Sequence, residues 1–138
     1  MIKPPQCSSF HLTVHTHIHR TESVEKLQAA LKNVIRLSTT NVENQGILVG
    51  TSDQVESLSI IYEQVRSRRS VSVLRRMLIN NLYGNTTYFL LNKQAAAAGV
   101  VALIDRENES PLGGLRIQVR CQPIQQVIDW LTLTLRQN

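Results

Sequence analysis

Three consecutive predicted strands in the second half of the chain constrain the fold more than any other feature. Tyr88–Leu91 and Val100–Ile104 are unbroken apolar runs, a pattern typical of strands that are buried on both faces of a sheet. In Leu115–Cys121 apolar residues alternate with polar ones, which predicts a strand with one polar face. A sheet with helices packed against it is therefore expected, rather than a helical bundle.

The first half of the sequence mixes strand and helix patterns. Phe10–His19 alternates with a period of two and predicts a half-buried strand. A helix is expected over Glu22–Arg36, with Thr21 as its N-cap and acidic residues in its first turn. Thr40–Glu43 and Gly46–Thr51 follow as two short strands that form a hairpin.

Three further helices are predicted from apolar spacing and from their start and stop signals. Asp53 begins a helix that extends to Val65, and Glu56 three residues later completes a capping box. The next helix covers 71–82 and stops at Gly84. Pro123 is the expected first residue of a last amphipathic helix, which continues to Leu135. The predicted order is β-α-β-β-α-α-β-β-β-α, an α+β fold with a mainly antiparallel sheet and helices packed on one face.

The length and composition fit one domain, residues 1–138, with a core built from aliphatic side chains. No apolar run reaches the length of a membrane span, and the first residues lack the apolar stretch of a signal peptide. We therefore expect a cytoplasmic protein that does not contact a membrane. Cys7 and Cys121 are too few and too far apart for a zinc motif or a disulfide scaffold, so reduced thiols are expected.

The chain is basic, with a formal net charge of +5, and eleven of its fifteen basic residues are arginine. Such a balance suits an anionic partner, with nucleic acid the first candidate. A cluster without any acidic residue supplies five of the arginines: Arg66, Arg68, Arg69, Arg75 and Arg76. Clustered guanidinium groups predict a surface that binds phosphates, although an ordinary solvated helix face has a similar pattern.

The polar face of the late strand is a second candidate for nucleic-acid contact. It carries Arg116, Gln118 and Arg120. If this face is shared with the first strand, the sheet presents arginine, glutamine and histidine together, a combination that binds unpaired bases or phosphates. The alternative is that this face contacts a second copy of the protein.

Four histidines alternate along the first strand: His11, His15, His17 and His19. Neighbouring imidazoles on one strand face can share a metal ion, as in some metal-dependent hydrolases, but such sites also require carboxylates from other segments. The simpler interpretation is a solvated sheet face. No nucleophile motif and no phosphate loop occurs in the sequence, so we expect neither an enzyme nor a cofactor.

Three strings, "FLLNKQAAAAGVVALID", "ESPLGGLRIQV" and "VIDWL", resemble a small archaeal family of uncharacterised or predicted RNA-binding proteins. The motif residues that match include Asn92, Lys93, Gln94, Ser110, Pro111 and Gly113. The resemblance implies a fold similar to the fifth large-subunit ribosomal protein, frequent dimerisation, and for some members a link to exosome neighbourhoods.

These features together predict a non-enzymatic RNA-binding protein, and the resemblance implies an RNA-processing complex as a further partner. The predicted phosphate contacts are Arg66, Arg68, Arg69, Arg75, Arg76, Lys93, Arg116 and Arg120. A homodimer is expected because two strands are apolar on both faces, although helices on the second face could cover them equally well. The alternatives are a structural or protein-interaction homodimer without RNA binding, and a histidine-based metal-dependent hydrolase.

Overall fold

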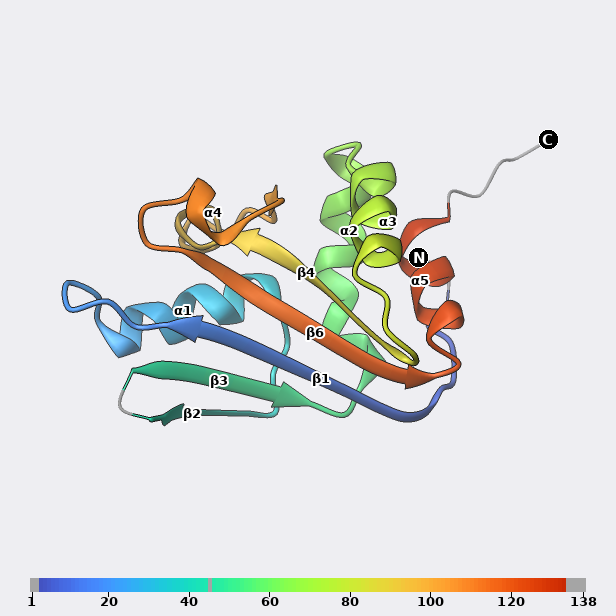
Figure 1. Ribbon diagram of the computed structural model, residues 1–138, viewed down its shortest axis with the longest axis horizontal. Helices are drawn as coiled ribbons and strands as arrows, with labels where there is room; N and C mark the ends of the chain where they lie inside the picture. The colour runs from blue at the N-terminus through green and yellow to red at the C-terminus, as the bar shows by residue number, and fades with distance from the viewer. Residues whose placement is uncertain (1–2, 45, 134–138) are drawn as a thin grey trace.

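The computed structural model describes residues 3–44 and 46–133 (Figure 1). The strands are β1 (Ser8–His17), β2 (Thr39–Glu43), β3 (Ile47–Ser52), β4 (Thr86–Asn92), β5 (Leu103–Ile104) and β6 (Gly114–Gln122). The helices are α1 (Val24–Val34), α2 (Ser59–Ser67), α3 (Val71–Asn80), α4 (Lys93–Ala97) and α5 (Ile124–Thr132). Two short 3₁₀ turns, η1 (Val55–Leu58) and η2 (Glu107–Glu109), lie before α2 and before β6.

The described strands form one six-stranded sheet in the order β2-β3-β1-β6-β4-β5. Each pair of neighbouring strands is antiparallel. The two longest strands, β1 and β6, lie side by side at its centre (Figure 1). The predicted α+β class with a mainly antiparallel sheet is confirmed.

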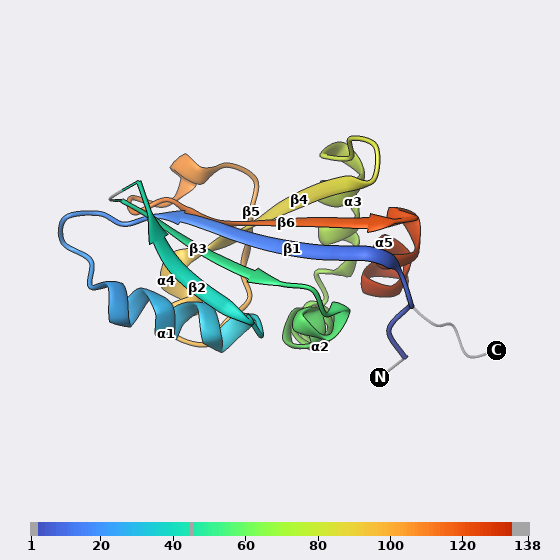
Figure 2. The same ribbon diagram turned by 90° about the horizontal axis from the view of Figure 1, so that it is seen from below.

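The helices cover one face of the sheet, as expected. Figure 2 shows α1, α2 and α5 along the same side of β1 and β6. On that side β1 contributes Phe10, Leu12 and Val14, which alternate along the strand and are buried in the core. The strand period of two therefore places the intervening residues of β1 on the opposite, helix-free side.

Two predicted helix starts are wrong in detail, the first because another residue supplies the cap and the second because the expected capping box does not form. α1 begins after Ser23, whose hydroxyl accepts a hydrogen bond from the Lys26 N–H at 3.3 Å, and not after Thr21. Hydrogen bonds from the backbone and from the Ser23 hydroxyl lower the pKa of Glu25 in the first turn of α1. No capping box forms at Asp53, because η1 precedes α2 and the Asp53 carboxylate pairs with His11 instead.

The alanine run after β4 forms the helix α4, which the sequence patterns did not predict. Asn92 caps it by accepting a hydrogen bond from the Ala95 N–H at 2.9 Å, and alanine has the highest helix propensity. α4 packs on α1, where the Asn33 amide donates to the Ala96 carbonyl at 3.0 Å. β5 covers only Leu103–Ile104 and does not begin at residue 100, and the Val101 N–H donates to the Gln64 side-chain oxygen at 2.7 Å.

The last two helices differ from expectation only at their ends. α3 stops at Asn80 rather than at residue 82, and Gly84 lies in the turn before β4 with a φ of +61°. Pro123 precedes α5 and does not form its first residue, and its peptide bond with Gln122 is cis. The predicted end of α5 at Leu135 lies outside the described residues.

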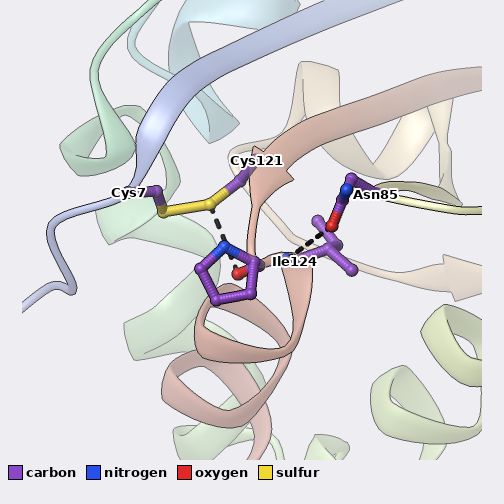
Figure 3. The surroundings of a disulfide bond; sticks show 5 residues. Cys7, Asn85, Cys121 and Ile124 are labelled. Carbon is purple, nitrogen blue, oxygen red and sulfur yellow. Dashed lines mark hydrogen bonds between the residues drawn. A yellow bond between two sulfur atoms is a disulfide. The ribbon is translucent and has the colours of Figure 1, made fainter.

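Cys7 and Cys121 form a disulfide bond, so the prediction of reduced thiols is wrong (Figure 3). The sequence separation of 114 gave no sign of the pairing, but the start of β1 lies beside the end of β6 and brings the Cα atoms of the two cysteines to 5.8 Å. Figure 3 shows the bond next to the first turn of α5, where the Ile124 N–H donates to the Asn85 side-chain oxygen at 3.4 Å. Disulfides occur in secreted proteins and also in intracellular proteins of hyperthermophiles, so this bond fits either compartment.

Among the described residues, no helix has the length and the apolar character needed to cross a membrane.

Candidate nucleic-acid interface

The side of the sheet that the helices leave uncovered carries a continuous set of polar side chains, which we call the open face. Across the central strands the opposed pairs are His11–Arg120, Thr13–Gln118 and His15–Arg116. Opposed residues in an antiparallel pair project to the same face of the sheet. The hypothesis that the late strand shares its polar face with the histidine strand is thus confirmed, and His17 continues the same face beyond His15.

An aromatic side chain also belongs to the open face. Tyr88 of β4 lies opposite Gln118, and the guanidinium of Arg116 lies over the Tyr88 ring, 3.8 Å from its centroid. Sequence patterns missed this contact because β4 is apolar along most of its length, so its register against β6 decides which of its residues share the polar face. A stacked arginine and tyrosine form a flat surface on which an unpaired base can stack.

The histidines of the open face have two kinds of surroundings. His11 Nδ1 lies 2.7 Å from the Asp53 carboxylate, whereas His15 and His17 are exposed. Within residues 3–44 and 46–133, no three His, Cys, Asp or Glu side chains lie close enough together to hold a metal ion. The carboxylates that the metal-dependent hydrolase hypothesis requires are therefore not gathered around these histidines.

The arginines of residues 66–76, which we call the helix-side arginines, lie in the helix layer on the other side of the sheet. Arg66 donates hydrogen bonds to four backbone carbonyls, at distances of 3.0–3.1 Å. These carbonyls belong to Tyr62, Trp130, Leu131 and Leu133. The guanidinium also lies over the Tyr62 ring, 3.6 Å from its centroid. Arg66 thus binds the C-terminal carbonyls of α5, and its hydrogen-bond donors are occupied by contacts within the fold.

Two more helix-side arginines are paired with carboxylates. Arg75 donates to the Asp129 carboxylate and to the Thr132 hydroxyl, both at 3.0 Å. Arg76 lies 3.3 Å from the Asp105 carboxylate, and both side chains of that pair are more than half exposed. These carboxylates lie far away in the sequence, which is why the cluster appeared to have no acidic partners.

Arg68 and Arg69 are exposed on the turn between α2 and α3. Arg69 has a φ of +56°, and no side-chain hydrogen bond or ion pair joins either residue to the rest of residues 3–44 and 46–133.

Lys93 differs from Arg68 and Arg69, because only 3% of its side chain is exposed. Its ammonium donates to the His17 carbonyl at 2.7 Å and to the Glu22 carboxylate at 3.1 Å. The eight predicted phosphate contacts thus do not form one surface, and Lys93 is not accessible to a phosphate in this structure.

The family-motif residues hold several loops together at one end of the sheet. The Ser110 hydroxyl donates to the Gln94 side-chain oxygen at 2.5 Å. The expected tight turn at Pro111 is present, because the Gly113 N–H donates to the Ser110 carbonyl at 3.0 Å and Gly113 has a φ of +83°. Together with Asn92 and Lys93, these contacts fix α4 and the segment before β6 against the end of β1.

The fold and the open face define a class of protein, a two-layer α+β fold in which the uncovered side of the sheet is a polar, arginine-bearing surface. A family model described as RNA binding matches residues 11–122, which is most of the chain. The protein belongs to this family.

Relatives and solved structures agree with this assignment. The chain is 34% identical over 124 residues to a UPF0201 protein of Sulfurisphaera tokodaii, covering 88% of this chain and 86% of the relative. A UPF0201 protein of Saccharolobus solfataricus is 31% identical over 121 residues, which are 86% of this chain and 83% of the relative.

Two crystal structures of UPF0201 proteins have a similar fold. One superposes with a TM-score of 0.78 at 21% identity, covering 93% of this chain and 97% of the other. The second, from Methanococcus jannaschii, has a TM-score of 0.74 at 22% identity, with 91% and 95% covered. The small archaeal family suggested by the motifs is therefore confirmed, while likeness to the fifth large-subunit ribosomal protein stays a prediction.

Proposed function

We propose that the protein binds single-stranded RNA on the open face and does so without catalysing a reaction. The observation that supports this most is the alignment of Arg116, Gln118 and Arg120 with the histidines of β1 on a helix-free sheet surface. Membership in a family described as RNA binding supports the same partner.

Each kind of side chain on the open face suits a different part of an unpaired nucleotide. Arg116 and Arg120 provide planar, permanently charged groups for phosphate oxygens. Gln118 has both a donor and an acceptor for a base edge. Tyr88 and Arg116 together provide a flat surface on which a base can stack. Only an unpaired base can use this surface, because a base within a duplex is already stacked on its neighbours.

The helix-side arginines have a smaller part in this proposal. The guanidinium groups of Arg66 and Arg75 already donate hydrogen bonds to other parts of the protein, so we assign no RNA contact to them. Arg68, Arg69 and Arg76 are the exposed members of the group, and Arg76 is paired with Asp105; all three could attract RNA only from the other side of the molecule. On the resemblance alone we also propose a cytoplasmic homodimer that acts within an RNA-processing complex.

The experiment is a comparison of RNA forms, followed by mapping of the contact surface. Fluorescence anisotropy should show tighter binding of a single-stranded oligonucleotide than of a duplex of the same length. Photocrosslinking with 4-thiouridine RNA should then label peptides of β1, β4 or β6. Absence of binding near physiological salt, or crosslinks confined to α2 and α3, would contradict the proposal.

A further inference from the structure

A hollow of about 320 Å³ lies at one end of the open face. Its lining residues are His17, Ile18, His19, Glu107, Leu112, Gly113 and Gly114. His17 is the last open-face residue of β1, and Gly114 is the first residue of β6. An RNA strand that follows the two central strands from Arg120 past Arg116 therefore reaches this hollow next.

The hollow combines polar side chains with a closely packed stretch of backbone at the start of β6. The side-chain nitrogens of His17 and His19 and the Glu107 carboxylate form no hydrogen bond or ion pair within residues 3–44 and 46–133. A Cβ atom at Gly114 would lie 2.9 Å from Ile104 and 3.9 Å from the Glu107 side chain. A larger residue at this position would therefore press on the Ile104 side chain and on the Leu91 carbonyl, and the Glu107 side chain lies near the start of β6.

The volume and the lining chemistry restrict the ligand. The hollow is at the small end of the range for ligand sites, so it suits a single planar group and not a longer ligand. Ile18 and Leu112 provide apolar walls, and the two imidazoles provide ring surfaces for stacking. An ionised glutamate accepts hydrogen bonds and donates none, so it selects a ligand with donors on the edge that faces it.

We infer that this hollow receives one unpaired guanine of the RNA bound on the open face, with Glu107 accepting hydrogen bonds from its Watson–Crick edge. Guanine carries two adjacent donors there, the ring N1–H and the exocyclic amino group, which matches the two oxygens of a carboxylate. Uracil offers one donor between two carbonyl oxygens, which a carboxylate disfavours. In duplex RNA this edge of guanine is already paired. The inference rests on the proposed RNA binding and adds to it a base preference at one position.

The test compares two single-stranded oligonucleotides of equal length, one of uridines only and one with a single central guanosine. A bidentate contact to a base discriminates by about tenfold or more, so the guanosine oligonucleotide should bind about ten times more tightly to the natural protein. Glu107→Gln should abolish this ratio. The matched control Glu56→Gln removes a likewise exposed negative charge on the helix side and should leave the ratio unchanged.

The outcomes separate the two proposals. If neither oligonucleotide binds, the proposed function fails and this inference fails with it. If both bind equally and Glu107→Gln has no effect on their ratio, RNA binding stands and the guanine site is overturned. A guanosine preference that Glu107→Gln removes and Glu56→Gln retains supports the site.

Discussion

Arg66 and Arg116 have the same local contact but opposite surroundings. Each guanidinium lies over a tyrosine ring, 3.6 Å from the Tyr62 centroid in one case and 3.8 Å from the Tyr88 centroid in the other. Arg66 is additionally bound to four carbonyls in the helix layer, whereas Arg116 projects from the open face. Density of arginine along the sequence therefore does not identify the binding surface, because hydrogen bonds from distant segments decide which guanidinium groups remain available.

The need for donors at the end of α5 explains the internal role of Arg66. The last carbonyls of a helix have no partner within the helix. Arg66 supplies donors to three carbonyls at this end, those of Trp130, Leu131 and Leu133. Its ring partner Tyr62 stacks on Trp130 with centroids 4.9 Å apart, so one arginine and two aromatic rings join α2 to α5.

The largest expected effect is on stability, from removal of Arg66. Because hydrogen bonds to a charged group contribute about 1.5–3 kcal/mol, Arg66→Ala should lower the free energy of unfolding by about 3 kcal/mol. Chemical denaturation measures this decrease. Arg68→Ala, two residues away and exposed, is the matched control and should change stability by less than about 0.5 kcal/mol. Equal free energies of unfolding for the two variants would contradict a stabilising role for Arg66.

A smaller decrease in stability is expected at Arg75. About a third of each side chain in the Arg75–Asp129 pair is exposed, so solvent weakens their attraction. Arg75→Ala should cost about 1 kcal/mol in denaturation experiments. A double-mutant cycle with Asp129→Asn isolates the pair. Full additivity of the two changes would show that the ion pair contributes nothing.

The smallest expected effect on stability is at Tyr88. Tyr88→Leu keeps an apolar side chain but removes the ring under Arg116, a cation–π contact that contributes about 0.5–1 kcal/mol at exposed sites. Stability should thus change little, while affinity for single-stranded RNA should fall several-fold because the variant has no ring on which a base can stack. Unchanged RNA affinity in a fully folded Tyr88→Leu variant would place the stacking elsewhere.

Local patterns were sufficient to predict the faces of the strands but not their partners. The alternation in β1 and β6 correctly separated buried from polar residues, and it predicted that Arg116, Gln118 and Arg120 share one face. Which strand lies beside β6 depends on pairing across the sheet, so Tyr88 was missed. The same limit concealed the disulfide, since its two cysteines come together only through the β1–β6 pairing.

Charge patterns failed for a related reason. Lys93 follows a buried strand and looked like a phosphate contact, yet its ammonium binds the His17 carbonyl and the Glu22 carboxylate, more than seventy residues earlier in the chain. α4 was missed because its five residues are too short for a periodic pattern to develop. Contacts between distant segments thus account for the main errors at the candidate site.

The salt dependence of RNA affinity tests the central claim, that the open face and not the helix-side arginines binds RNA. Two variants remove the same charge from opposite sides of the sheet: Arg116→Ala with Arg120→Ala, and Arg68→Ala with Arg69→Ala. Removal of one phosphate contact to a single strand flattens the slope of log affinity against log salt by about 0.7, so the open-face variant should flatten it by about 1.4. The helix-side variant should retain the slope of the natural protein. A flattened slope in the helix-side variant, together with an unchanged slope in the open-face variant, would contradict this account.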